Sequence, residues 1–152
     1  MSLEGPYDPE NVFAKIVRRE IPAARIFEDE HTLALMDAFP QARGHSLVIH
    51  KFARARNLLD VDTAHLQQVT STVQRVAQAT VAALRPDGVV VTQFNGAAAG
   101  QTVFHLHVHI IPRWDGVVLG RHGADMADRD ELLSLAAQIA AQIPVPTPLD
   151  PA

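Results

Sequence analysis

Residues 105–111 read His-Leu-His-Val-His-Ile-Ile, with a histidine at every second position. Successive side chains of a strand point to opposite faces, so this alternation predicts a strand whose His105, His107 and His109 share one face. The aliphatic residues between them would then pack against a core. The three imidazoles would form one continuous chemical surface, which constrains both the fold and the chemistry of this chain.

The rest of the chain predicts an α+β fold. Apolar runs separated by turns predict about five strands in an antiparallel sheet, at residues 25–28, 32–37, 45–50, 89–94 and 102–112. The fourth run reads as a buried strand. Apolar residues at helical spacing predict one long helix and two shorter ones, at residues 62–84, 11–19 and 128–143. Asp62 and Asp128 are in the N-cap positions of two of them. We expect one domain at residues 11–143, between an N-terminal extension (1–10) and a proline-rich tail (144–152).

Composition excludes several classes of function. The net charge of −4, with no basic block, argues against binding of a nucleic-acid polymer. No run is long enough to span a membrane. The absence of cysteine excludes disulfides, thiolate catalysis and cysteine-ligated zinc, and agrees with an expected cytoplasmic location.

Three interpretations of the histidines remain open. They could be structural, but three buried rings would each need a hydrogen-bond partner and would repel one another when protonated. They could bind a metal, but in a strand the outer two Cα atoms lie about 13 Å apart, and no carboxylate or cysteine set completes a site. They could act on phosphorus, because a neutral imidazole can attack it directly and split one displacement into two steps. We favour the third interpretation and expect no bound metal.

Small polar residues precede the histidines. Asn95-Gly96 and Gly100-Gln101-Thr102 form a turn-rich segment whose backbone N–H groups could surround an anion. Donors placed there would stabilise the charge on the non-bridging oxygens of a phosphate.

The same residues carry a resemblance to a known family. The chain resembles the histidine triad (HIT) family, whose signature alternates three histidines with hydrophobic residues. The likeness extends to residues 13–23, 35–37, 40–42, 45–49, 95–96 and 100–104. It implies the HIT-like fold, a homodimer, and nucleotidyl transfer or hydrolysis at the α-phosphate of a nucleoside phosphate ester, amide or dinucleoside polyphosphate.

The resemblance also implies residue roles. His107 would be the nucleophile that becomes nucleotidylated, His109 would contact the phosphate and assist the leaving group, and His105 would bond toward His45. Asp37 would accept the ribose hydroxyls. Phosphate contacts would come from Asn95, Gln101 and Thr102, and the slot for a purine base of adenosine type from Val12, Phe13, Ile16, Leu35 and Met36. No cofactor is required, although magnesium could accompany a polyphosphate substrate.

Departures and alternatives remain. Many relatives bind structural zinc through a Cys-x-x-Cys pair, whose places here hold Asn11 and Ala14, and His50 is either a remnant of such a site or unrelated. Taken singly, Phe13 and Ile16 fit a core equally well, and Asp37 fits a turn. His31, His65 and His122 are expected at turns or on the surface. The alternative function is a nucleotide-binding regulatory protein with weak or incidental hydrolase activity.

Overall fold

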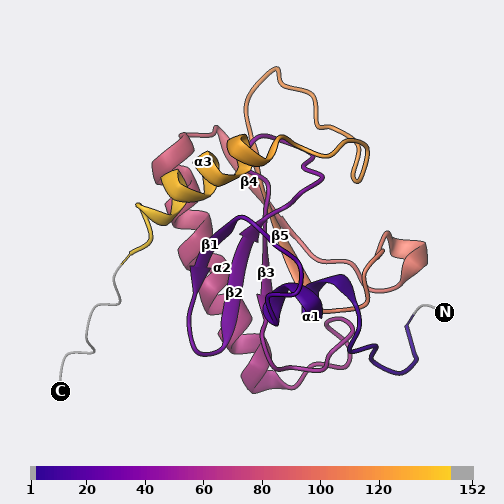
Figure 1. Cartoon of the computed structure of the whole chain (residues 1–152). Helices are drawn as coiled ribbons and strands as arrows, with labels where there is room; N and C mark the ends of the chain where they lie inside the picture. Colours follow the sequence, from indigo (N-terminus) through magenta and orange to yellow (C-terminus); the bar gives the residue numbers. More distant parts are fainter. Residues whose placement is uncertain (1–2, 145–152) are drawn as a thin grey trace.

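The computed structural model describes residues 3–144, so the predicted tail beyond Pro144 lies outside the described residues. Five strands form one antiparallel sheet in the order β1-β2-β3-β5-β4 (Figure 1). The strands are β1 (Arg25–Glu28), β2 (Thr32–Met36), β3 (Ser46–His50), β4 (Gly88–Thr92) and β5 (His107–Arg113). The helices are α1 (Val12–Val17), α2 (Thr63–Leu84) and α3 (Arg129–Ala140), with a 3-10 turn η1 (Ala97–Ala99). The predicted α+β class is confirmed.

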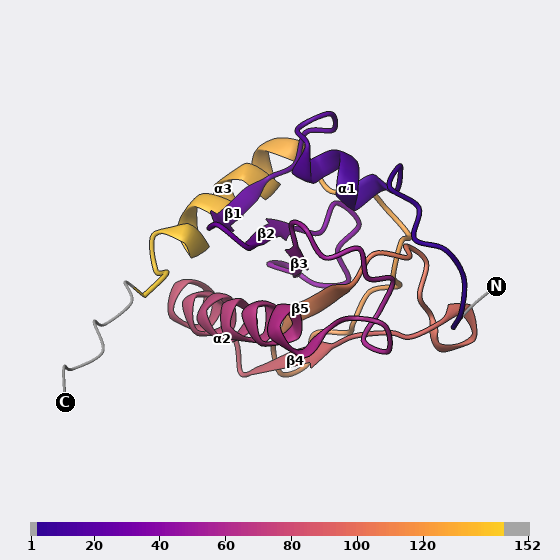
Figure 2. The same ribbon diagram turned by 90° about the horizontal axis from the view of Figure 1, so that it is seen from below.

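Helices cover both faces of the sheet. Figure 2 shows α2 and α3 on one side and α1 on the other. Alternate residues of β2 and β3 supply the two cores: Ala34 and Val48 pack with α2 and α3, whereas Leu35 and Leu47 pack with α1. Each strand therefore separates an α2/α3 face from an α1 face. None of the described helices combines the length and apolarity needed to cross a membrane.

Side-chain caps begin the helices where the sequence predicts. Asp62 accepts a hydrogen bond from the backbone N–H of His65, and Asp128 accepts one from Glu131. Asn11 caps α1 in the same way, by accepting from Ala14. Such caps satisfy backbone donors that have no partner within the helix.

Two strand predictions need correction. The run at residues 89–94 was expected to be buried, but β4 is an edge strand that pairs only with β5, and Val90 and Val91 are exposed in the single chain. The triad strand begins at His107, not at residue 102. Residues 103–105 form bends, and Leu106 packs with Ala53 and Ala55 in a small separate cluster.

Candidate active site

The triad histidines lie on the α1 face of the sheet. In the β3–β5 pair, His107 is opposite Ile49 and His109 is opposite Leu47, and directly opposite residues of an antiparallel pair share a face. The ring centroids of His107 and His109 are 5.0 Å apart. Although His105 precedes the strand, the ring of Phe13 lies near both His105 and His107, at 5.9 and 4.9 Å. The three rings therefore form one row, as the alternation predicts.

Hydrogen bonding determines the tautomer of His107. Its Nδ1 lies 2.6 Å from the carbonyl oxygen of His105. A carbonyl oxygen only accepts, so Nδ1 carries the proton and Nε2 has a free lone pair. Burial lowers the pKa of His107 below its usual value, which keeps the ring neutral. A neutral imidazole with an unprotonated Nε2 is the nucleophilic form.

A second chain of hydrogen bonds determines the tautomers of His45 and His109. The backbone N–H of Gln41 donates to Nδ1 of His45 over 3.0 Å, so the proton of His45 lies on Nε2. That proton is donated to Nδ1 of His109 over 2.9 Å, which leaves the proton of His109 on its own Nε2. The prediction that His105 bonds toward His45 is therefore wrong: His109 is the partner of His45, and the ring of His105 bonds to the backbone of His50 instead. Burial is the main cause that lowers the pKa of His45 to about 4 and that of His109 to about 3, with neighbouring histidines adding to it.

The proton on Nε2 of His109 has no acceptor within residues 3–144, although this nitrogen is buried. A buried donor without a partner costs about 1–3 kcal/mol, so such groups in folded proteins call for an explanation. Here the donor lies on β5 beside His107, whose Nε2 carries no proton. An oxygen of a bound substrate would satisfy it.

Asp37 follows β2 and faces the same histidines. Its Oδ1 accepts from the backbone N–H of Phe39, and its Oδ2 lies 3.4 Å from Nε2 of His45 and 3.9 Å from Nδ1 of His109. Burial raises the pKa of Asp37. The carboxylate thus adds negative potential beside the histidine chain, and Oδ2 is its free acceptor.

Asp37, His45 and His109 are close enough to hold a metal, since their ligand atoms all lie within 4.8 Å of one another. A ligating nitrogen needs its lone pair, however, and Nε2 of His45 carries the ring proton as long as Gln41 donates to Nδ1. Metal binding would have to break that bond. The donor set therefore fits a hydrogen-bonded chain better than a metal centre.

His50 also lacks a free ligand atom. Its Nδ1 accepts from the backbone N–H groups of Phe52 and Ala53, and its Nε2 donates to the side-chain oxygen of Gln68. The rings of His31 and His65 lie beside it, away from the triad. His50 is thus a buried histidine whose two ring nitrogens both have hydrogen-bond partners.

The residues expected to contact phosphate differ in availability. Gln101 is buried, and its side-chain amide is used internally: the oxygen accepts from Gly96 and Asn57, and the nitrogen donates to the carbonyl oxygens of Arg56 and Val103. Gln101 therefore shapes the loop. The side chain of Asn95 is half-buried and accepts from the backbone N–H of Leu58, whereas Thr102 is exposed.

The expected base slot is only partly assembled. Phe13, Ile16 and Leu35 belong to one apolar cluster on the α1 face, next to the triad, and Val12 is exposed at its edge. Met36 belongs to the opposite cluster with α2 and α3. Neighbouring residues of a strand point to opposite faces, so Met36 cannot line a slot that contains Leu35.

Sequence reasoning missed His122, which it expected on the surface. The loop after β5 returns over the site, since Gly120 and Ala127 donate backbone hydrogen bonds to the carbonyl oxygens of Gln41 and Ala38. Nε2 of His122 lies 4.0 Å from Oδ2 of Asp37, and its ring centroid lies 5.4 Å from that of His109. The only sign of this contact in the sequence is the glycine at position 120. A Cβ there would lie 2.9 Å from the carbonyl oxygen of Gln41, so the close approach of the two backbones requires glycine.

Comparisons with known proteins agree with this geometry. Residues 18–116 match the model of the HIT domain. A HIT-like protein from Bartonella henselae, solved with an unknown ligand, is 46% identical with a TM-score of 0.86 over 91% of this chain and 99% of its own. The adenosine 5′-monophosphoramidase HNT1 of Saccharomyces cerevisiae is 33% identical over 94% of this chain and 89% of its own. The adenylylsulfatase HINT3 of Arabidopsis thaliana is 34% identical over 88% and 71%.

A domain match over more than half of the chain, together with relatives of this identity and coverage, establishes the family. The row of three histidines, two on β5 and one in the bend before it, is the structural counterpart of that match. The chain belongs to the HIT family, whose members are nucleotide hydrolases or transferases.

Proposed function

We propose that this protein cleaves or transfers at the α-phosphate of a nucleoside phosphate ester, amide or dinucleoside polyphosphate, through a covalent nucleotidyl-histidine on His107. The observation that carries the proposal is that two neighbouring imidazoles of β5 present Nε2 atoms in opposite protonation states. Nε2 of His107 has a free lone pair, and Nε2 of His109 holds a proton with no acceptor among residues 3–144. One is a nucleophile and the other a donor, which is what a displacement at phosphorus needs.

The reaction consists of two displacements at phosphorus. The lone pair of His107 forms a P–N bond while the bond from phosphorus to the leaving atom breaks. On substrate binding, Nδ1 of His109 takes up a proton from solvent, and the Nε2–H of His45 then donates to Oδ2 of Asp37, 3.4 Å away. The negative charge of a bound phosphate opposes the desolvation that holds the pKa of His109 near 3, so it favours this imidazolium form. His109 gives one proton from Nε2 to the leaving group and returns to neutral. Water or another acceptor then attacks phosphorus, its proton passes to the neutral His109, and the P–N bond breaks, which regenerates His107.

Substrate recognition uses the α1 face. Asp37 accepts the ribose hydroxyls through Oδ2, and Phe13, Ile16 and Leu35 contact a purine base. The side chains of Thr102 and Asn95 contact phosphate oxygens, whereas Gln101 acts only through the loop that it holds. Relatives described as an adenosine phosphoramidase and an adenylylsulfatase support an adenosine-type substrate. Magnesium enters only as the partner of a polyphosphate.

The protein acts as a homodimer that joins two sheets through β4. This edge strand exposes Val90 and Val91, and the neighbouring helix α2 exposes Val81. An edge strand with exposed valines is a surface that proteins usually cover. A second copy would cover it.

The test is nucleotide turnover by His107→Ala, with His31→Ala as the control at an exposed histidine away from the triad. Adenosine phosphoramidate, adenylyl sulfate and diadenosine polyphosphates are offered to each variant. We expect turnover to vanish in His107→Ala while adenosine monophosphate still binds, and acid-quenched wild-type protein to carry a nucleotidyl adduct on His107 in mass spectrometry. Normal turnover by folded His107→Ala would exclude the mechanism. Wild-type turnover below about one per minute on every substrate would favour the regulatory alternative, since enzymes commonly reach about 1–10³ s⁻¹.

Asp37→Asn tests the ribose contact. It should weaken binding of adenosine monophosphate much more than binding of inorganic phosphate, because only the nucleotide has ribose hydroxyls. Calorimetric titration measures both. An equal loss for the two ligands would refute the ribose role of Asp37.

A further inference from the structure

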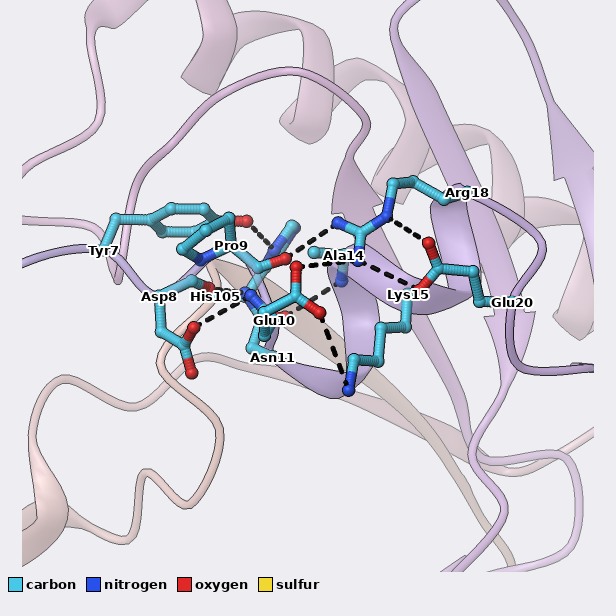
Figure 3. Close-up of polar contacts among 10 residues, drawn as sticks. All are labelled: Tyr7, Asp8, Pro9, Glu10, Asn11, Ala14, Lys15, Arg18, Glu20 and His105. Atoms are coloured by element: carbon cyan, nitrogen blue, oxygen red, sulfur yellow. Dashed lines mark hydrogen bonds and ion pairs between the residues drawn. The ribbon is translucent and has the colours of Figure 1, made fainter.

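The N-terminal segment, defined here as residues 3–10, reaches the triad. Tyr7 lies 98 positions before His105, yet its hydroxyl oxygen is 2.8 Å from Nδ1 of His105 (Figure 3). Tyr7 is the only tyrosine of the chain, and it precedes the part that matches the HIT domain, which starts at residue 18. The segment that looked like an extension therefore touches the first triad histidine.

The direction of this hydrogen bond follows from the other side of the ring. Nε2 of His105 lies 3.2 Å from the carbonyl oxygen of His50, which can only accept, so Nε2 carries the proton. Nδ1 is then an acceptor, and the Tyr7 hydroxyl is the donor. His105 is 1% exposed, so without Tyr7 its Nδ1 would be a buried acceptor lacking a protein partner.

The orientation of His105 bears on the nucleophile. The carbonyl oxygen of His105 accepts from Nδ1 of His107 over 2.6 Å, and that bond keeps the proton off Nε2 of His107. The ring of Phe13 contacts both imidazoles, so a rotation of one ring disturbs the packing of the other. Two hydrogen bonds hold the ring of His105, one from the Tyr7 hydroxyl and one to the His50 carbonyl oxygen. A third joins the backbone of His105 to Nδ1 of His107 and so sets the tautomer of His107.

The other hydrogen bonds and ion pairs of the segment are on the surface. Arg18 donates to the carbonyl oxygen of Pro9 and pairs with Glu10, and Asn11 donates to the carbonyl oxygen of Asp8, as Figure 3 shows. Exposed ion pairs of this kind contribute little to stability. They hold the segment near the site, but the contact of Tyr7 with His105 is the one that reaches a buried polar atom of the triad.

We propose that Tyr7 is a positioning residue for the reaction, whose hydroxyl fixes the orientation and tautomer of His105 and, through the His105 carbonyl, the nucleophilic tautomer of His107. The proposal rests on the proposed function, in which His107 attacks with Nε2. It makes the N-terminal segment a part of the active site.

Tyr7→Phe removes only the hydroxyl, so it is the variant to measure. A fraction of molecules with the wrong tautomer of His107 lowers kcat and leaves nucleotide binding intact. We expect kcat to fall about tenfold with KM changed by less than about twofold, within the range seen when the support of a catalytic group is removed. Arg54→Met is the matched control, because Arg54 lies over the Tyr7 ring but makes no contact with the hydroxyl, and it should leave kcat unchanged.

A double-mutant cycle with His105→Ala isolates the hydrogen bond. Without the His105 ring the hydroxyl has nothing to position, so adding Tyr7→Phe to His105→Ala should change kcat by less than about twofold. An undiminished tenfold effect in that background would overturn the proposal. Full activity of Tyr7→Phe itself would also overturn the proposal. If His107→Ala is inactive in the same assay, the proposed function would still stand.

A second readout does not depend on turnover. In ¹⁵N-histidine NMR spectra of the intact protein, wild-type His105 should be in the Nε2–H form and His107 in the Nδ1–H form. In Tyr7→Phe we expect the Nδ1 resonance of His105 to shift and the Nε2–H form of His107 to become visible. Unchanged spectra at both residues would refute the positioning role even if no substrate were known.

Discussion

Acidification should destabilise this protein strongly, because its site histidines are buried without charge. Burial lowers the pKa of His105 to about 4 from an ordinary value of 6.5, and the pKa of His45 and His109 to about 4 and about 3. A histidine whose pKa is lower in the folded chain binds a proton more readily in the unfolded chain than in the folded one. Its contribution to stability is therefore complete above pH 6.5 and is lost as the pH falls toward the folded-state value.

The magnitude follows from the linkage relation. A histidine with pKa values of 6.5 unfolded and about 4 folded loses about 2 kcal/mol of stability between pH 7.5 and pH 5. His45 and His109 share a hydrogen bond and titrate as a pair, so we count them as one group. Together with His105 they remove about 4 kcal/mol, a large part of the roughly 5–15 kcal/mol of an ordinary domain. Asp37 acts in the opposite direction, because its raised pKa adds stability at low pH that is lost as the pH rises through the folded value.

Urea unfolding at several values between pH 7.5 and pH 5.5 measures this dependence. Near pH 5.5 these two groups alone should give a slope of the unfolding free energy against pH that corresponds to about two protons taken up on unfolding, or about 2.4 kcal/mol per pH unit. His107, whose pKa burial also lowers, adds to this uptake. His105→Gln should reduce that uptake by about one proton. An uptake below one proton in the wild-type protein would refute the conclusion that these histidines are buried and neutral.

Three further predictions concern other parts of the molecule. Gln101→Ala should lower the unfolding free energy by about 3 kcal/mol, since it removes four hydrogen bonds, three of them buried; a loss below about 1 kcal/mol in urea denaturation would contradict its structural role. His122→Ala should lower kcat/KM for an adenosine nucleotide about tenfold without lowering stability, because its ring is exposed but borders Asp37 and His109; unchanged kinetics would place it outside the site. Val91→Glu should yield a monomer in light scattering, because it puts a charge on the exposed edge strand; a wild-type protein that is already monomeric would refute the dimer.

Local patterns predicted much of the fold and the triad. Alternation along residues 107–110 depends only on strand geometry, which is why the shared face of His107 and His109 could be predicted before any contact was known. The helix starts at Asp62 and Asp128 were equally predictable, because capping is a contact between residues three apart. The same alternation rule, applied to residues 32–36, would have separated Met36 from Leu35.

The prediction for β4 was wrong for a reason that no local pattern contains. A run of apolar residues has the same sequence pattern in a central strand as in an edge strand that another surface covers. Strand order decides which it is, and strand order depends on how distant segments pair. The late start of β5 has a similar origin, since Leu106 bonds to Ala55 in the loop after β3 instead of to a neighbouring strand.

The sequence alone determined that three imidazoles lie in a row on a sheet and that the chain belongs to the HIT family. Tertiary structure decided the chemical state of each ring, through the backbone N–H of Gln41 and the carbonyl oxygens of His50 and His105. It also brought His122 to the site from a loop. The physical reason is that the protonated nitrogen of an imidazole is chosen by its hydrogen-bond partners, and here most of those partners come from other segments of the chain.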